Sequence, residues 1–368
     1  MAINTTIKAR AVIFAGGIGT RMWPVSRTTY PKQFEKIINN KSTIELTIDH
    51  LRPEFAWEDI YISTNILYVD IIRRQLPKIP QANIIGEPAR RDVAPAVGYS
   101  MAIMERLGAE PVVILWSDHI RNKPQVFKKI IKTGVEFINK NPEKFLFVGQ
   151  KPRFANQNLG WIEIGKTREI FKGFKIYNFN GLVYQPDKDL AEKFYKSKRH
   201  FWNPGYWVVK PSLVMQQYKK FAPDMFKKLL ELADSYGLKD HKKTLNEIYP
   251  SLEKISFDKA ILEKLEFKKG AVMVADMGWS DVGTWQALKE TLQKNPEENV
   301  CYGKTYSLKT INSLVYNYTP KLIATVGLKD TAVVVTSDVI LVCNENCMSE
   351  IKTLVEILGK NNKYKKYT

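Results

Sequence analysis

The chain has 368 residues, of which 44% are hydrophobic, 11% aromatic and 26% charged, and its formal net charge is +18. This length suits two domains, or one large domain with an appendage, and the apolar content excludes a wholly disordered chain. No apolar run approaches the roughly 18 residues that a membrane-spanning helix needs, and the first ten residues carry no apolar signal segment, so we expect a cytoplasmic protein.

The cysteine count and the net charge limit the kinds of ligand that the protein is expected to bind. Three cysteines, Cys301, Cys343 and Cys347, cannot form a disulfide framework, and without a nearby His they favour free thiols over a zinc site. The excess of 56 basic over 38 acidic residues is typical of proteins that bind nucleic acids or small phosphates. Because the lysines are spread thinly, except in residues 360–366, we expect phosphate ligands and no specific nucleic acid.

Short apolar runs alternate with helical patterns along the first 150 residues. Strands are expected at 11–15, 59–63, 84–85, 112–116 and 145–148, and helices at 69–76, 92–107 and 126–139. A further helix is expected to begin at Ser42 or Thr43, either of which can cap it, because Ile44, Ile48 and Leu51 recur at helical spacing. This alternation predicts an α/β fold with a mostly parallel sheet covered on both faces. Ligands of such sheets bind beyond the carboxyl ends of the strands, so we expect the chemistry just after Ala15, Ile85 and Trp116.

The pattern of expected helices and strands changes in the second half of the chain. Helices are expected at 189–196 and 224–233, followed by short β-rich runs at 313–316, 322–326, 331–335 and 339–343 and a terminal helix at 348–358. We therefore predict a large domain at 1–295 and a small β-rich domain at 300–368.

A glycine-rich segment, GGIGTRMWP, follows the first expected strand and continues to PKQF at residues 31–34. Glycines after a buried strand allow backbone N–H groups to approach an anion, and Arg21 and Lys32 supply cations for a polyphosphate. The spacing fits neither a Walker A loop nor GxGxxG. An ordinary turn with solvated cations is the alternative, which the regular placement of Arg21, Trp23-Pro24 and Pro31-Lys32 disfavours. The residues of this segment that contact the polyphosphate would be Gly16, Gly17, Gly19 and Thr20.

Five further motifs follow in order: EPARRDVAP from Glu87, SDH from Ser117, GWI from Gly160, WNPG from Trp202 and GWSDVGTW from Gly278. Together with the glycine-rich segment they closely resemble the bacterial mannose-1-phosphate guanylyltransferases, or GDP-mannose pyrophosphorylases, of the sugar-nucleotidyltransferase superfamily. The resemblance implies a Rossmann-like nucleotidyltransferase domain with a mostly parallel mixed sheet, and a small β-helix-like C-terminal domain. The chain has no room for the isomerase domain fused to some relatives, so a single activity is expected.

Two aspartates suggest a metal site. Asp118 follows the apolar strand at 112–116, and Asp281 lies in a turn between Gly278 and Gly283. Mg²⁺ takes one or two carboxylates and completes its octahedron with water and phosphate oxygens. By resemblance, both aspartates would hold the Mg²⁺ that bridges the nucleotide and the sugar phosphate. His119 invites assignment as a general base, but a sugar phosphate is already an anionic nucleophile and needs none.

The resemblance also implies binding residues for the base and the sugar. Glu87 would accept the adjacent N1–H and N2–H groups of guanine, and Arg91 would support the nucleotide loop, although a simple helix-entry charge is the alternative for Arg91. Gly160 and Asn203 match positions that face the sugar. The Glu-Lys-Pro of relatives, whose Glu binds sugar hydroxyls and whose Lys binds the sugar phosphate, is Tyr184-Gln185-Pro186 here. Gln185 can still form hydrogen bonds, and Lys188 is a candidate substitute for the cation.

The expected reaction is GTP plus mannose 1-phosphate to GDP-mannose and pyrophosphate, by in-line attack on the α-phosphorus with Arg21, Lys32, Asp118 and Asp281 as catalytic residues. A sister enzyme using another hexose 1-phosphate or nucleotide is one alternative, and a catalytically silent sugar-nucleotide-binding regulatory homologue is another. A nucleic-acid-binding protein is suggested by the net charge alone. A homodimer is one oligomeric state that the sequence leaves open.

Overall fold

The computed structural model describes residues 7–17, 19–38, 40–108 and 110–368, and the chain packs into two compact units. The sheet unit consists of the residues up to Gly16, Thr47–Ser117 and Arg121–Trp279. The β-helix unit consists of Gly17–Leu46, Asp118–Ile120 and Ser280–Thr368. The glycine-rich segment thus packs with residues far from it in the sequence. The predicted division at 1–295 and 300–368 stays a prediction.

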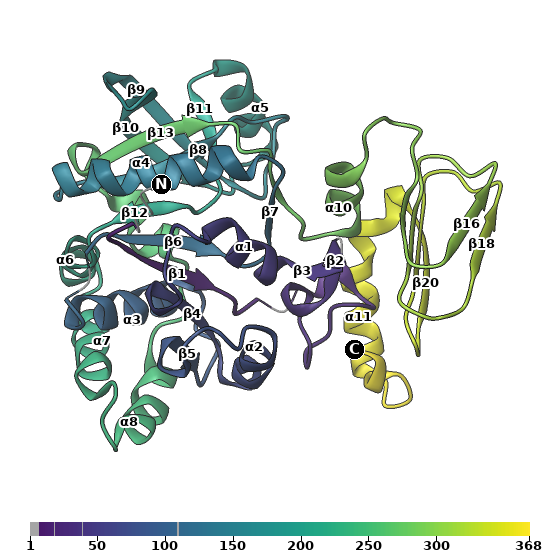
Figure 1. Cartoon of the computed structure of the whole chain (residues 1–368), viewed down its shortest axis with the longest axis horizontal. Helices are drawn as coiled ribbons and strands as arrows, with labels where there is room; N and C mark the ends of the chain where they lie inside the picture. Colours follow the sequence, from purple (N-terminus) through teal and green to yellow (C-terminus); the bar gives the residue numbers. More distant parts are fainter. Residues whose placement is uncertain (1–6, 18, 39, 109) are drawn as a thin grey trace, which may run out of the picture. The chain divides into compact units, whose positions relative to one another are not determined.

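A ten-stranded mixed sheet forms the centre of the sheet unit (Figure 1). In spatial order its strands are β11 (His200–Asn203), β9 (Gly160–Phe171), β10 (Phe174–Tyr184), β13 (Gly270–Ala275), β8 (Phe145–Gln150), β12 (Trp207–Val209), β6 (Val112–Trp116), β1 (Arg10–Phe14), β4 (Ile60–Asn65) and β5 (Ile84–Glu87). β6, β1, β4 and β5 pair in parallel, as do β8 and β13. β12 is antiparallel to both β6 and β8, so these two groups point the same way. The mostly parallel mixed sheet is confirmed.

Helices cover both faces of this sheet. The helices of the unit are α2 (Val69–Gln75), α3 (Val93–Arg106), α4 (Pro124–Lys140), α5 (Lys188–Ser197), α6 (Pro211–Phe221), α7 (Pro223–Ser235), α8 (His241–Ile248) and α9 (Phe257–Ala260). Gly134 of α4 lies against Leu146 and Val208, where an added Cβ would come within 3.1 Å of each side chain. Phe145 and Phe147, which alternate with Leu146, join the core that contains α3 and α7. Because neighbouring strand residues point to opposite faces, α4 and α3 lie on opposite sides of the sheet.

The carboxyl ends of the parallel strands meet at one edge of the sheet unit. Ala15, directly after β1, donates its N–H to the carbonyl of Ser63, and Ser117, directly after β6, donates to the carbonyl of Phe14. Glu87 ends β5 at the same edge, where its carboxylate accepts a hydrogen bond from the Ser63 hydroxyl at 2.7 Å. The three strand ends at which we expect ligand binding therefore lie at a common edge, as the parallel order of the strands requires.

The β-helix unit winds its strands into parallel coils. One sheet contains β15 (Val300–Tyr302), β17 (Leu314–Asn317), β19 (Thr331–Val335) and β20 (Ile340–Asn344), and a second contains β16 (Thr305–Leu308) and β18 (Ile323–Val326). β15, β17 and β19 pair in parallel and in register, while β20 closes the stack antiparallel to β19. The small β-helix-like domain is confirmed, and the terminal helix appears as a 3₁₀ segment, Glu345–Glu350, followed by α11 (Ile351–Lys360).

Capping chemistry explains where the first helix, α1 (Thr43–Leu51), begins. The backbone N–H of Ser42 donates to the Glu45 carboxylate at 2.7 Å, and the N–H of Glu45 donates to the Ser42 hydroxyl at 3.3 Å. This reciprocal pair is a capping box, which satisfies two backbone donors at the helix start. Ser42 or Thr43 as the predicted start of this helix is confirmed.

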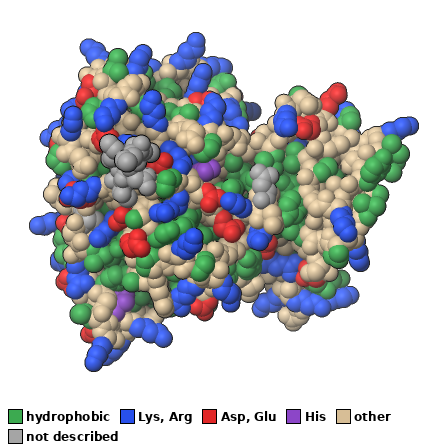
Figure 2. All heavy atoms as spheres, in the orientation of Figure 1, with side chains coloured by type: hydrophobic (Ala, Val, Ile, Leu, Met, Phe, Trp, Pro, Cys, Tyr) green, Lys and Arg blue, Asp and Glu red, His purple; other side chains and the backbone are tan. Residues whose placement is uncertain are grey.

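Charged side chains are distributed over the surface. On the face shown in Figure 2, Lys and Arg side chains are scattered, with Asp and Glu side chains among them. Among the described residues, no helix combines the length and the apolar character needed to cross a membrane.

Candidate active site

Lys32 lies at the centre of the charged residues of the β-helix unit. It opens a short 3₁₀ helix, Lys32–Phe34, and only 5% of its surface is exposed. Its ammonium nitrogen lies 3.0 Å from Asp118 Oδ2 and 3.9 Å from Asp281 Oδ1, and it donates to the carbonyl of Val282 at 3.3 Å. One buried cation therefore brings together two aspartates that are far apart in the sequence.

Two short strands place these aspartates. Asp118 immediately precedes β7 (His119–Arg121), and Asp281 ends β14 (Trp279–Asp281). β7 and β14 form a two-stranded sheet, so the two acids come from paired segments. Their side chains are 33% and 36% exposed, which leaves carboxylate oxygens open to a ligand.

The charge state of Asp118 follows from its neighbours. Burial acts to raise the pKa of Asp118, but the Lys32 ammonium and, next, His119 outweigh burial and hold that pKa below its ordinary value. Asp118 is therefore an anion at neutral pH. His119 Nε2 lies 3.8 Å from Asp118 Oδ1, so this imidazole is placed beside the carboxylate.

Two glycines give the charged side chains room. Gly19 has a φ of 69°, and a Cβ there would lie 2.7 Å from Lys32 Cγ, so the absence of a side chain lets the Lys32 stem pass. At Gly283 a Cβ would lie 3.1 Å from Asp281 Oδ1 and 3.2 Å from Arg21 Nη2. The Arg21 guanidinium and the Asp281 carboxylate therefore flank the same glycine.

The rest of the glycine-rich segment is open. Gly16 and Gly17 are exposed, and a Cβ at either would meet no atom within 4 Å. Thr20 and Arg21 belong to the 3₁₀ helix Thr20–Met22, and the Arg21 side chain is exposed. Ile18, in the same loop, lies outside the described residues. An open glycine backbone and an exposed guanidinium are each suited to contact with an anion.

Glu87 is buried in the sheet unit with both oxygens engaged. It is 9% exposed, and its oxygens accept hydrogen bonds from the Ser63 and Tyr249 hydroxyls, each at 2.7 Å. Burial raises the pKa of Glu87, while the Tyr249 and Ser63 hydrogen bonds act in the opposite direction. Each oxygen has a second lone pair, so one acceptor position per oxygen is left after these bonds form.

Arg91 lies in the loop between β5 and α3. Its Nε is buried and has no hydrogen-bond partner among the described residues. A buried donor without a partner costs free energy, so this nitrogen is a candidate for contact with a ligand. The neighbouring Asp92 caps α3, because its carboxylate accepts the N–H of Val93 at 2.7 Å.

The predicted sugar residues meet at one corner of the sheet. Gly160 pairs with Tyr184 on β10 and with Asn203 on β11, and a Cβ on Gly160 would lie 3.3 Å from Asn203 Cβ. Gln185 follows directly, exposed and with a φ of 54°. Asn203 is 8% exposed, and its Oδ1 already accepts the N–H of Gly205 and the indole N–H of Trp207. Both lone pairs of Asn203 Oδ1 are therefore engaged, and a ligand would meet its amide N–H groups.

The sheet does not bring the base and sugar residues into one cluster. Glu87 ends β5 at one margin of the ten strands, whereas Gly160 and Asn203 lie on β9 and β11 at the other. Sequence reasoning missed Tyr249 and Ser63, which hold Glu87. It also missed Glu263, whose carboxylate accepts the backbone N–H of Tyr184 at 3.2 Å. No local pattern marks these residues, because each reaches the site from another part of the chain.

Comparison with known proteins shows the family of this chain. The family model described as nucleotidyl transferase matches residues 10–298, and the model described as MannoseP isomerase/GMP-like beta-helix domain matches residues 303–358. The chain is 32% identical over 357 residues to mannose-1-phosphate guanylyltransferase 2 of Escherichia coli O157:H7, covering 95% of this chain and 73% of that protein. It is 30% identical over 367 residues to mannose-1-phosphate guanylyltransferase of Klebsiella pneumoniae, covering 97% and 75%.

This chain belongs to the mannose-1-phosphate guanylyltransferase family of nucleotidyltransferases. Its fold also matches a crystal structure from Thermus thermophilus, described as a mannose-1-phosphate geranyltransferase, with a TM-score of 0.86 and 27% identity. That match covers 95% of this chain and 99% of the Thermus chain. The family acts on nucleoside triphosphates and sugar 1-phosphates, so the chain is a nucleotidyltransferase that serves nucleotide-sugar synthesis.

We expect Gly19→Ala to lower the turnover of nucleotidyl transfer by about 10²-fold, because a misplacement of about 1 Å in a catalytic group has this effect. The new Cβ would collide with the Lys32 stem, and the positive φ would strain any side chain there. Pyrophosphate release measures the rate, and thermal unfolding shows whether the fold survives. Gly17→Ala, with space for its Cβ, should leave the melting temperature unchanged. Normal turnover of Gly19→Ala would show that Lys32 does not need this clearance.

A second prediction concerns Glu35, three residues after Lys32. Burial raises the pKa of Glu35 from 4.5 to about 7, against the opposing effect of Arg27. The folded state therefore keeps a proton that the unfolded state loses, so stability falls as pH rises from 4.5 to about 7. We expect Glu35→Gln to raise the melting temperature by a few degrees at pH 8 and hardly at all at pH 5. The exposed Glu297→Gln is the control, and equal shifts of Glu35→Gln at both pH values would contradict the assignment.

Proposed function

We propose that this chain transfers a guanylyl group from GTP to mannose 1-phosphate, giving GDP-mannose and pyrophosphate. The observation that carries the proposal is the convergence of Asp118 and Asp281 on the buried Lys32, with the exposed Arg21 beside the same glycine as Asp281. This arrangement offers two anions for a metal and two cations for phosphates in one place. A regulatory, non-catalytic homologue would not need to retain all four groups.

The two carboxylates fit a Mg²⁺ ion. Both approach one ammonium, both are about one-third exposed, and the lowered pKa of Asp118 keeps that carboxylate ionised. Among the described residues there is no cluster of three or more His, Cys, Asp or Glu side chains suited to a metal. Mg²⁺ accepts such a two-carboxylate site because water and phosphate oxygens complete its coordination. The ion would neutralise charge on the phosphates.

The chain's own residues would position the reactants. In the proposed reaction an oxygen of the sugar phosphate forms a bond to the α-phosphorus of GTP, the bond from that phosphorus to the β-phosphate oxygen breaks, and pyrophosphate leaves with the electron pair. Lys32 would stabilise negative charge on the α-phosphate, and Arg21 with the backbone of Gly16, Gly17, Gly19 and Thr20 would hold the departing phosphates. Positioning and charge neutralisation suffice for such a reaction.

Base and sugar recognition are assigned to the sheet unit. Glu87 would accept N1–H and N2–H of guanine with its two remaining lone pairs, and Arg91 would use its unpartnered Nε beside it. Gly160, Gln185 and Asn203 would face the sugar. Lys188, exposed at the first position of α5 beyond Gln185, is the candidate cation for the sugar phosphate.

A sister specificity is the second candidate, and the Tyr184-Gln185 pair favours it. The usual Glu and Lys are absent there, so the sugar could be another hexose 1-phosphate, or the nucleotide another triphosphate. A panel of four nucleoside triphosphates against several sugar 1-phosphates, read by pyrophosphate release, separates the candidates. We expect the highest kcat/KM for GTP with mannose 1-phosphate. A higher value for another pair would reassign the substrate, and tight GDP-mannose binding without any turnover would support the regulatory homologue.

We expect Asp118→Asn to reduce turnover by 10²-fold or more, the order seen when one charge-stabilising group is removed. The amide is isosteric but neutral, so it would lose both the ion pair with Lys32 and the affinity for a divalent cation. Pyrophosphate release over a range of Mg²⁺ concentrations is the measurement, with circular dichroism to confirm folding. A near-normal rate in the folded variant would remove Asp118 from the proposed metal site.

A further inference from the structure

The helix α10 (Trp285–Leu292) begins directly after the segment that carries Asp281. Asp281, Val282 and Gly283 lead into Thr284, whose hydroxyl caps the helix by accepting the N–H of Ala287 at 3.0 Å. Val282 is fully buried, and its carbonyl accepts a hydrogen bond from Lys32. Any shift of the start of α10 would therefore be felt at Asp281 and at Lys32.

The first turn of α10 also holds the loop of Arg21. Trp285 is fully buried, and its indole N–H donates to the carbonyl of Trp23 at 2.9 Å. Its ring packs against Tyr316 of β17, with ring centroids 5.5 Å apart. Trp23 in turn follows Arg21 by two residues and is 5% exposed. The helix start thus links the Arg21 segment, the Asp281 segment and the β-helix core.

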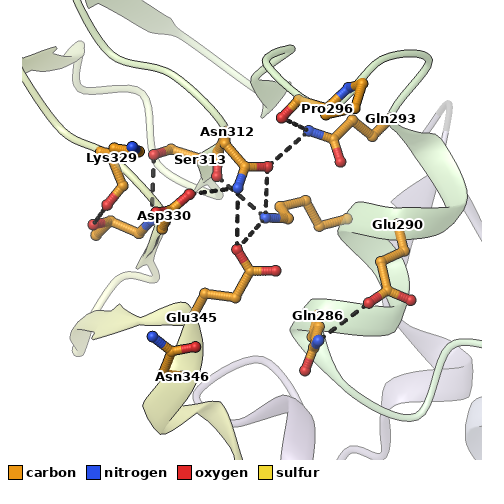
Figure 3. A network of polar contacts seen from close by, with 12 residues as sticks. Gln286, Glu290, Gln293, Pro296, Asn312, Ser313, Lys329, Asp330, Glu345 and Asn346 are labelled. Atoms are coloured by element: carbon orange, nitrogen blue, oxygen red, sulfur yellow. Dashed lines mark hydrogen bonds and ion pairs between the residues drawn. The ribbon is translucent and has the colours of Figure 1, made fainter.

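The second half of α10 is fixed by a buried lysine. Lys289 is 2% exposed, and its ammonium donates to the carbonyl oxygen of Asn312 at 3.2 Å and to Asn312 Oδ1 at 2.9 Å. It also forms an ion pair with Glu345 at 2.6 Å. Figure 3 shows this network, in which Gln293 also donates to Asn312 Oδ1 and the Asn312 amide donates to Asp330 and Glu345. All three ammonium protons are engaged, by Asn312 in the connection between β16 and β17 and by Glu345 at the start of the 3₁₀ segment after β20.

A buried lysine is a costly way to attach a helix. Removing charged groups from water carries a large desolvation cost, and apolar side chains of similar volume often stabilise a protein as well or better. The network adds directional hydrogen bonds: three donors with fixed acceptors define one position of α10. An apolar contact would allow α10 to shift along its partner. Misplacement of a catalytic group by about 1 Å can cost about 10²-fold in rate, so such definition has a functional value at Asp281.

We propose that Lys289 is a positioning residue for the charged site: its network with Asn312 and Glu345 fixes α10, and α10 fixes Asp281 and, through Trp285, the Arg21 loop. This rests on the proposed function only in taking Asp281 as a ligand of a divalent cation. The β-helix domain then contributes to catalysis by setting the geometry of residues at the far end of α10.

The test replaces the ammonium and keeps the stem, in Lys289→Met. Three readouts are taken: Mn²⁺ binding to the protein without nucleotide by electron paramagnetic resonance, the Mg²⁺ concentration for half-maximal rate, and the KM for GTP. We expect Mn²⁺ affinity to fall and the half-maximal Mg²⁺ concentration to rise, each by about 10-fold, with a change of less than about twofold in the KM for GTP. All measurements are made well below the melting temperature.

Lys144→Met is the matched control. Lys144 is also a buried lysine, 9% exposed, and it donates a hydrogen bond to the carbonyl of Lys268. Lys144 directly precedes β8, so it lies at the amino-terminal end of that strand and away from the edge where the parallel strands end. Its replacement should lower the melting temperature without changing Mn²⁺ affinity. If Lys289→Met does not fold, Glu345→Gln replaces it, because the amide keeps an acceptor for Lys289 and removes only the charge.

The outcomes are decisive for the positioning role. Unchanged Mn²⁺ affinity in a folded Lys289→Met or Glu345→Gln protein overturns it, as does an equal loss in Lys144→Met. If the unaltered protein binds Mn²⁺ but transfers no guanylyl group, the proposed reaction fails while the comparison of variants still decides the role of Lys289. If the unaltered protein binds no Mn²⁺, the metal site and the inference both fall.

Discussion

The shared ion pair of Lys32 with Asp118 and Asp281 is the constraint around which the charged site is built. Two carboxylates that approach each other repel, and burying an ammonium without an anion costs free energy. Each of the three groups therefore offsets the electrostatic cost of the others. The lowered pKa of Asp118 records this balance. In the proposed function the same three groups would hold the metal and stabilise the phosphate that is transferred, so a stabilising interaction and a reactive one would coincide here.

Apolar neighbours hold these charges in position. Met22, Ile120 and Val282, each one or two residues from Arg21, Asp118 and Asp281, are buried in one core. That core also contains Leu314, Tyr316 and Val334 of the β-helix strands. The charged residues can therefore remain at the surface while their backbone is fixed by burial. A β-helix that might be taken for an appendage is the hydrophobic support of the charged site.

Much of the fold could be predicted from the sequence, because its signals are local. Alternation of apolar runs and helical periodicity marks β1, β4, β5 and β6, and the glycine-rich segment and Asp118 fall where parallel strands end. The β9–β10 hairpin was not located, since its pairing is interrupted by register shifts and its burial is irregular. Tyr249, Glu263 and Lys289 were missed for another reason: their partners are distant in sequence, and no local pattern around them indicates these bonds.

The amide of Asn203 has a consequence for the chemistry of recognition. Its carbonyl oxygen accepts hydrogen bonds from Gly205 and Trp207, so in the proposed sugar site Asn203 would act only as a hydrogen-bond donor. A sugar hydroxyl at this amide would accept the N–H hydrogen bond with its oxygen and donate its own hydrogen to another group. At the sugar carbon that faces the amide, an ether oxygen would accept this hydrogen bond as well as a hydroxyl does, whereas a CH₂ group would not. In the proposed sugar site, Asn203 would thus select for an oxygen atom and not for the hydrogen that it carries.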